Sequence, residues 1–328
     1  MRLSLVTDSL SNLPLTAVLD AAAALGIEGL EVNTGNWSAA PHVDLARLLA
    51  DAGARERLAA DIAARGLELV ALNANGNQLH PRDGARQRAV VEDTVRLAGL
   101  LGVRRVCLMS GLPGGSPDDA TPNWVVTAWP PECGEILRWQ WEAVLLPYWA
   151  TLADHSAAHG VDELCVEMHG HQLVHGAPTL LRLRAAIGPV VCANLDPSHL
   201  FWMGADPLAV IHELGPALRH VHLKDTFVSE RRRAVSGVLD PGGVEGIGDR
   251  AWRYATLGYG HDERWWREFC YRLRMVGYDG WLSIEHEDEL IGREEGVERS
   301  VALMRAVMPR AAPDYRPQDI AGAPVTAP

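Results

Sequence analysis

The chain has 328 residues, 48% hydrophobic and 22% charged, which is the composition of an ordinary globular protein and excludes fibrous and disordered classes. Its 30 basic and 42 acidic side chains give a formal net charge of −12, which argues against nucleic-acid binding. The sequence contains no apolar run long enough for a membrane span, no export signal and no C-x-x-C pair among its five cysteines. We therefore expect a soluble, cytoplasmic protein with reduced thiols and no membrane or nucleic-acid partner.

A recurring unit organises the chain: a helical stretch rich in Ala, Leu and Arg, then a glycine suited to a left-handed helix cap, then a short apolar run. With the run at the N-terminus, the pattern predicts eight strands, at residues 3–8, 29–33, 67–73, 104–110, 163–169, 190–196, 218–225 and 281–287. Apolar strands that alternate with helices predict an α/β fold, a single-domain (β/α)8 TIM barrel over residues 1–308. The first strand is not followed by G-x-G-x-x-G, which disfavours an open, doubly wound sheet.

Two connections are too long for simple loops between a strand and a helix. They span residues 111–137, after the fourth strand, and 225–261, after the seventh. Both lie on the side where barrel enzymes keep their chemistry, so we expect them to form lids or partner surfaces. Residues 309–328 are rich in Pro and Ala and are predicted to form an extended or mobile tail.

The last four predicted strands end in side chains that can bind a metal ion: Glu167, Asp196, His222 and Glu285. Neighbouring strands of a barrel would direct all four into one mouth. A single polar strand end is usually only a cap, but four consecutive ends with ligand-competent side chains favour a site. Clustered carboxylates also repel one another unless a cation compensates them. The sequence thus predicts one divalent ion, Mn²⁺ first, with Mg²⁺, Co²⁺ and Zn²⁺ as alternatives.

These residues make the chain resemble the xylose-isomerase-like TIM barrel superfamily, the sugar phosphate isomerases/epimerases, which includes ketose 3-epimerases and endonuclease IV. The resemblance covers nearly the whole chain and is most specific at Glu167, at D-P-S-H in 196–199, at H-L-K-D in 222–225 and at Glu285. It implies that the four candidate ligands hold a catalytic metal and that the two glutamates also exchange a proton with the substrate. It further implies that His199 contacts a substrate hydroxyl or a second metal.

Departures from the family pattern narrow the range of expected substrates. Endonuclease IV needs additional histidines on earlier strands, and Asn73 and Ser110 at the ends of the third and fourth strands cannot replace them. A basic cluster after the last two strands is limited to Arg231, Arg232 and Arg233, and no glycine-rich phosphate loop accompanies it. We therefore expect a non-phosphorylated substrate rather than DNA or a sugar phosphate.

Two further side chains at the barrel mouth are candidate catalytic residues. His169 lies two residues after Glu167 on the same face of the strand and could be a general base, although a structural histidine is an equal alternative. Lys224 is the only lysine of the chain and shares the face of His222. It could orient a substrate oxygen or pair with Asp225; Schiff-base chemistry at this lysine would be redundant beside a metal.

Candidate substrate-binding residues lie in loops around the mouth. Asn75 and His80 belong to the polar segment N-A-N-G-N-Q-L-H-P, which suits a polyhydroxylated ligand but is also a plain turn signal. Trp202 could offer a flat surface to a sugar or aglycone ring. His199 and Lys224 complete the predicted set.

The leading functional hypothesis is a divalent-metal-dependent isomerase or epimerase that acts on a non-phosphorylated sugar or keto-sugar through an enediolate. The first alternative is a metal-dependent lyase or deglycosidase that eliminates the aglycone from a 3-oxo-glycoside, a version that could require a small partner subunit. The second is a non-catalytic sugar-binding protein. Self-association into a homo-oligomer is the default expectation, because long apolar and Trp-bearing loops are present.

Overall fold

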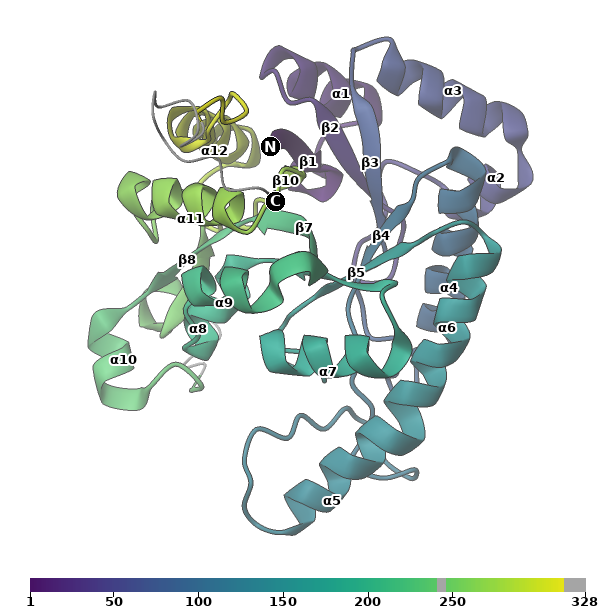
Figure 1. The fold of residues 1–328 in the computed structure, drawn as a ribbon, viewed down its shortest axis with the longest axis vertical. Helices are drawn as coiled ribbons and strands as arrows, with labels where there is room; N and C mark the ends of the chain where they lie inside the picture. The colour runs from purple at the N-terminus through teal and green to yellow at the C-terminus, as the bar shows by residue number, and fades with distance from the viewer. Residues whose placement is uncertain (241–245, 316–328) are drawn as a thin grey trace, which may run out of the picture.

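The computed structural model describes residues 1–240 and 246–315. Eight parallel strands close into a barrel in the order β1-β10-β7-β6-β5-β4-β3-β2, with helices around it (Figure 1). This confirms the predicted (β/α)8 barrel and its single domain. The barrel strands are β1 (Arg2–Val6), β2 (Gly29–Asn33), β3 (Glu68–Asn73), β4 (Arg105–Leu108), β5 (Glu163–Glu167), β6 (Val191–Leu195), β7 (Leu218–Leu223) and β10 (Trp281–Ile284).

Helices follow the barrel strands along the chain. The α-helices are α1 (Leu15–Ala24), α2 (Leu45–Ala50), α3 (Ala52–Ala63), α4 (Gly84–Leu101), α5 (Glu132–Trp139), α6 (Leu146–Ala158), α7 (Ala177–Ile187), α8 (Pro197–Met203), α9 (Pro207–Leu214), α10 (Glu230–Ser236), α11 (Glu263–Met275) and α12 (Arg293–Val307). Short 3-10 segments are η1 (Thr7–Leu10), η3 (Gly215–Ala217) and η4 (Ile247–Asp249), and η2 (Gln140–Leu145) is a π-helical segment.

Glycines end helices where the sequence predicts it. The predicted cap glycines all have positive φ angles: Gly26, Gly66, Gly102, Gly160, Gly188, Gly215 and Gly277. Gly102 caps α4 at φ 70° and ψ 20°. This left-handed backbone conformation is strained for residues that have a Cβ atom but not for glycine. The chain can then turn directly into β4, which begins at Arg105.

The interior of the barrel is polar beneath its mouth. Alternation along the strands directs leucines such as Leu3 and Leu5 toward the helices and the residue between them, Ser4, inward. Buried polar residues at inward-facing strand positions include Ser4, Glu31, Asn73, Asn194, His220, His222 and Ser283. A TIM barrel usually fills this space with branched apolar side chains, so a polar interior indicates a specific role.

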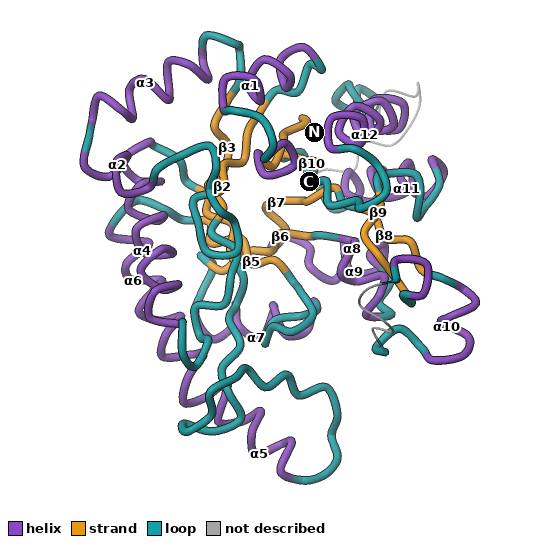
Figure 2. The backbone as a smooth tube through the Cα atoms, turned by 180° about the vertical axis from the view of Figure 1, so that it is seen from behind, coloured by secondary structure: helices purple, strands orange, loops and turns teal. Residues whose placement is uncertain are grey.

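The two long connections are only partly loops. After β4 the chain runs without helix or strand to α5, which continues through η2 into α6 and projects from the barrel (Figure 1). In the second connection, β8 (Asp225–Val228) pairs antiparallel with β9 (Trp252–Ala255), and this small sheet lies beside α10 outside the barrel (Figure 2). The Asp225 carboxylate anchors the end of the connection, because it accepts the backbone N–H groups of Gly258, Gly260 and His261.

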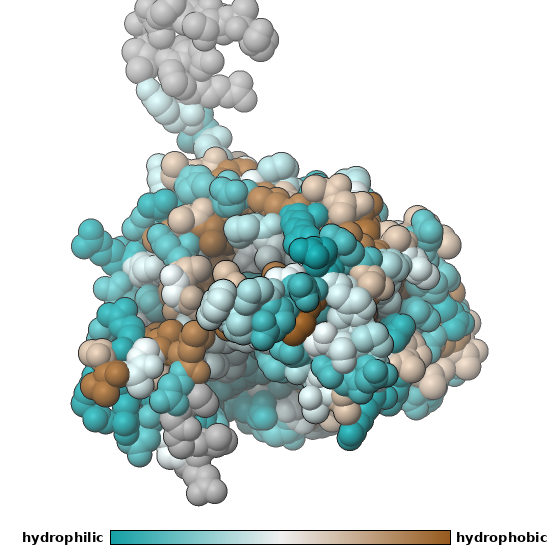
Figure 3. All heavy atoms as spheres, turned by 90° about the horizontal axis from the view of Figure 1, so that it is seen from below, coloured by the Kyte–Doolittle hydropathy of each residue, from teal (hydrophilic) through white to brown (hydrophobic). Residues whose placement is uncertain are grey.

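The face seen in Figure 3 is mostly hydrophilic with separate hydrophobic patches. No helix within residues 1–240 and 246–315 is long and apolar enough to cross a membrane. All five cysteines are free, and all but Cys133 are buried. In the predicted tail, residues 310–315 are exposed and form no helix or strand, and residues 316–328 lie outside the described part.

Candidate metal centre

Four potential ligands meet at the carboxyl end of the barrel. Glu167 is the last residue of β5, Asp196 follows β6, His222 lies near the end of β7, and Glu285 follows β10. Their strands are neighbours in the barrel order. One donor atom from each side chain lies within 4.8 Å of the others. The structure therefore brings the four predicted ligands together, since consecutive strand ends share one rim.

The donor atoms suit a divalent cation. Glu167, Asp196 and His222 are buried, and Glu285 is half-buried. Asp196 caps α8 by accepting the Ser198 N–H on Oδ1 at 2.8 Å. Its Oδ2, like Nδ1 of His222, makes no hydrogen bond to any described residue, although charged groups lie within ion-pair distance. Three carboxylates and one imidazole whose donor atoms converge fit Mn²⁺, Mg²⁺, Co²⁺ or Zn²⁺.

Lys224 supplies the positive charge nearest to these carboxylates. Its Nζ lies 2.6 Å from Glu285 Oε2, 3.2 Å from Asp196 Oδ2 and 3.1 Å from Glu287 Oε2. The alternative that it pairs with Asp225 is wrong, because adjacent residues of an extended chain point to opposite sides. Burial alone would lower the pKa of Lys224, but these carboxylates raise it well above its usual value. The lysine is thus an ammonium ion beside the site.

His199 is held as a charged group at the edge of the site. Its Nε2 lies 2.7 Å from Glu167 Oε1 and 3.1 Å from Asp196 Oδ2, and its Nδ1 lies 2.9 Å from the hydroxyl of Tyr254. Burial alone would lower the pKa of His199, but Asp196 and Glu167 raise it to about 9. Both ring nitrogens already have protein partners, so a substrate hydroxyl would have to replace one of them. Asn75 holds the second oxygen of Glu167, with Nδ2 at 2.5 Å from Oε2.

His169 has the opposite protonation preference. Burial, followed by the charge of His199, lowers its pKa well below the usual value. The two rings lie 4.0 Å apart. His169 donates from Nδ1 to the carbonyl oxygen of Gly170, which leaves Nε2 unprotonated in the neutral ring. Two neighbouring titratable groups whose pKa values are shifted in opposite directions are typical of sites for acid–base chemistry.

A small cavity lined mostly by polar side chains opens onto two of the four candidate ligands, Glu167 and Glu285. Its volume is about 220 Å³, below the roughly 300–1,000 Å³ of pockets for drug-sized ligands, so it suits a small molecule. The predicted site residues that line it are Asn75, Glu167, His169, His199, Lys224 and Glu285. The other charged side chains in its wall are acidic, namely Asp8 and Glu287. A wall with four carboxylates against the cationic Lys224 and His199 disfavours a phosphorylated ligand.

Two predicted substrate contacts have other roles in the structure. His80 uses Nδ1 to accept the backbone N–H groups of Arg82 and Asp83, which fixes a turn, and it is not among the residues lining the cavity. Trp202 is buried in α8 and stacks on Trp252 with ring centroids 4.7 Å apart.

Trp202 packs against tryptophans from both long connections. Trp124 of the first connection packs edge-on against Trp202 at 6.4 Å. In the second connection, Trp252 stacks on Trp202 and also contacts Tyr254, with ring centroids 5.3 Å apart. Trp202 therefore supports the wall that presents Tyr254 to His199.

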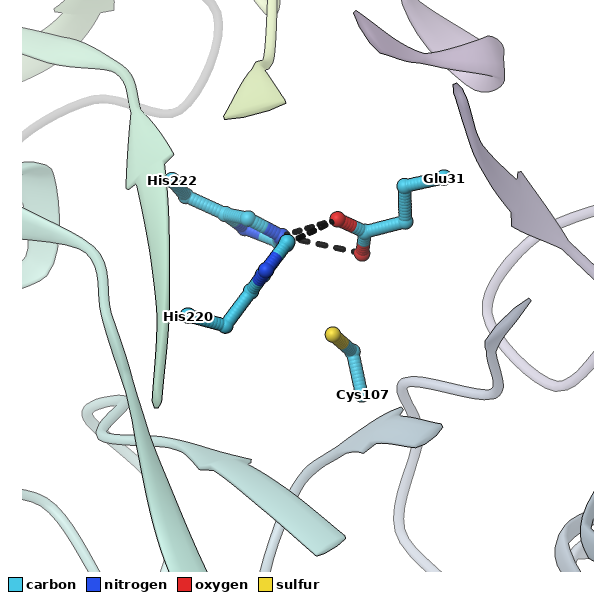
Figure 4. A group of neighbouring side chains, drawn as sticks. All are labelled: Glu31, Cys107, His220 and His222. Carbon is cyan, nitrogen blue, oxygen red and sulfur yellow. Dashed lines mark hydrogen bonds and ion pairs between the residues drawn. The ribbon is translucent and has the colours of Figure 1, made fainter. Parts of the chain in front are cut away.

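Sequence reasoning missed Tyr254, Glu31 and His220. Tyr254 lies in a polar insertion that gives no strand signal. Glu31 and His220 lie inside strands, whereas the ligands predicted from the sequence all lie at strand ends. The available signal for Glu31 was an acidic residue within the apolar run G-L-E-V-N, because a buried carboxylate needs polar partners. Figure 4 shows Glu31 pointing across the barrel to His220 and His222.

Comparisons with known proteins place the chain in a family. Residues 19–307 match the model of the xylose isomerase-like TIM barrels, and the chain belongs to this family. It is 46% identical over 308 residues to the uncharacterized protein YfiH of Bacillus subtilis (strain 168), an alignment covering 93% of this chain and 98% of YfiH.

Solved structures share the fold at low identity. The probable 3-DHS dehydratase AsbF of Bacillus anthracis has a TM-score of 0.66 and 18% identity, with 93% of this chain and 99% of AsbF covered. The D-psicose 3-epimerase of Clostridium cellulolyticum H10 has a TM-score of 0.60 and 15% identity, with 94% and 99% covered. At these identities the likeness supports the barrel fold alone.

Binding of a divalent ion is expected to tighten as the pH rises. Burial alone would lower the pKa of His222, but Glu31 and Glu285 raise it well above its usual value. The metal-free ring is therefore protonated at neutral pH, and an ion that binds Nδ1 must release that proton. Affinity should rise about tenfold per pH unit for each proton released. Zn²⁺ titrations at pH 6, 7 and 8 measure this; a pH-independent affinity would contradict it.

Proposed function

We propose that this protein is a divalent-metal-dependent isomerase or epimerase that acts on a non-phosphorylated sugar or keto-sugar through an enediolate. The observation that carries the proposal is the convergence of Glu167, Asp196, His222 and Glu285 beside a small polar cavity. The fold likeness to a D-psicose 3-epimerase agrees with it. The predominantly acidic cavity wall supports an unphosphorylated substrate.

The side chains around the ligands have complementary tasks. A divalent cation held there would supply positive charge that stabilises two oxygens on adjacent substrate carbons when the hydroxyl-bearing carbon loses its proton. Glu167 and Glu285 line the cavity and can exchange that proton with the carbon. His169 is a neutral base, whereas Lys224 is a fixed cation that can orient a substrate oxygen.

The second candidate function is a lyase that uses the same deprotonation to expel a group from the neighbouring carbon. One observation favours it: the Trp37 ring lines the cavity and is 52% exposed, so the mouth offers a flat apolar surface to an aglycone. The fold likeness to a probable dehydratase agrees with elimination chemistry.

Deuterium exchange separates these reactions. The protein, loaded with Mn²⁺, is incubated in D2O with a panel of free ketoses and 3-oxo-glucosides, with and without chelator. We expect chelator-sensitive exchange into one carbon–hydrogen bond of a free sugar. Release of the aglycone would favour the lyase, and metal-loaded protein that exchanges no hydrogen in any substrate would refute the enzymatic proposal.

A further inference from the structure

The imidazole of His222 belongs to two buried groups of side chains. Its Nδ1 faces the metal centre, at 3.4 Å from Glu167 Oε2 and 3.2 Å from Glu285 Oε2. Its Nε2 points into the barrel, at 3.0 and 3.1 Å from the two oxygens of Glu31 (Figure 4). The two nitrogens of one ring thus serve different neighbours.

Glu31 is placed as a hydrogen-bond acceptor. It is fully buried in β2. Asn73 donates to Oε1 from Nδ2 at 2.7 Å, and Nε2 of His220 lies 2.6 Å from Oε2. Because an ionised carboxylate can only accept hydrogen bonds, the nearest nitrogen of His222 must carry a proton. A buried carboxylate with three donors around it is also well compensated for its burial.

We propose that Glu31 is a positioning residue of the metal centre: it holds a proton on Nε2 of His222 and so directs the lone pair of Nδ1 toward the other ligands. This inference rests on the proposed metal centre. A ligating histidine generally donates its second N–H to a carboxylate or carbonyl, which fixes the ring orientation and makes the ligating nitrogen more basic. Glu31 provides that contact from the opposite side of the barrel, through β2.

A second metal ion in the barrel interior is the competing interpretation. Donor atoms of Glu31, Cys107, His220 and His222 also lie within 4.8 Å of one another. An ion bound there through Nε2 of His222 would displace the proton that Glu31 accepts. A neutral imidazole has only one unprotonated nitrogen, so His222 cannot serve both ions without becoming an imidazolate. The geometry therefore favours one ion, held on the Nδ1 side.

The test compares Zn²⁺ affinity and stoichiometry in three variants. Glu31→Gln should weaken binding about 10- to 100-fold. Ser283→Ala is the matched control, because Ser283 is the register partner of His222 on β10, is equally buried, and its Oγ bonds to none of the described residues. It should bind Zn²⁺ like the natural chain. Cys107→Ser should still bind one ion per chain; loss of an ion in this variant would overturn the inference in favour of an interior metal.

Nuclear magnetic resonance on the natural chain gives an answer that does not depend on any variant folding. In the Zn²⁺-loaded protein, nitrogen-15 spectra of His222 should show the proton on Nε2 and the metal on Nδ1. The reverse assignment, or natural affinity in Glu31→Gln, would overturn the role of Glu31 while leaving the metal centre intact. A natural chain that binds no divalent ion would refute the proposed function as well, so the two failures are distinguishable.

Discussion

Replacement of Glu285 by glutamine is expected to remove divalent-ion retention and to lower substrate deuterium exchange by at least about 100-fold, while the barrel stays folded. The substitution keeps the shape of the side chain but removes the charge that a cation needs. Lys224 still has Asp196 and Glu287 as partners, so no buried cation is left unpaired. Metal content, exchange rate and circular dichroism of the purified variant measure the three parts of this result.

The control for Glu285→Gln is Glu298→Gln. Glu298 lies on α12 and is exposed, so the same chemical change there should leave metal content and exchange unaltered. Normal metal content together with full exchange in Glu285→Gln would contradict the assignment of this residue.

Lys224→Met is expected to slow exchange by about 100-fold while metal binding is retained or becomes tighter. The ammonium lies within 3.2 Å of two candidate ligands, Asp196 and Glu285, where it repels an incoming cation. Its removal would also take away the cationic partner that we propose for a substrate oxygen. Lys224→Arg should not restore exchange, because the larger, planar guanidinium cannot reproduce the contacts of a compact ammonium with three carboxylates.

Parallel measurements of Zn²⁺ affinity and exchange rate test the role of Lys224. If the lysine serves only to stabilise the fold, the metal-loaded Lys224→Met protein should exchange at the natural rate. That result, or loss of metal binding in this variant, would contradict the proposed role.

The fold could be predicted from local signals. Cap glycines such as Gly102 mark the end of a helix through a conformation that other residues avoid, and apolar runs mark the buried strands. The four candidate ligands could also be found, because a barrel places the ends of its strands on one rim. Glu167 and Glu285 are 118 positions apart in sequence, yet their strand positions predict that they meet.

The remaining features depend on contacts that local patterns do not encode. Tyr254 reaches His199 only because the second connection folds into a small sheet and stacks on Trp202. The contact between Glu31 and His222 crosses the barrel interior. It depends on which side chains within a strand point inward, and this cannot be found by considering the strand ends alone. The alternation of side chains along a strand would also have corrected the expected pairing of Lys224 with Asp225.

The most direct test of the metal centre is anomalous diffraction at the manganese edge from Mn²⁺-soaked crystals. We predict a single strong peak per chain, bonded to Glu167, Asp196, His222 Nδ1 and Glu285. Absence of a peak among these four side chains, or a peak between Glu31, Cys107 and His220 instead, would contradict the metal centre on which the proposed chemistry depends.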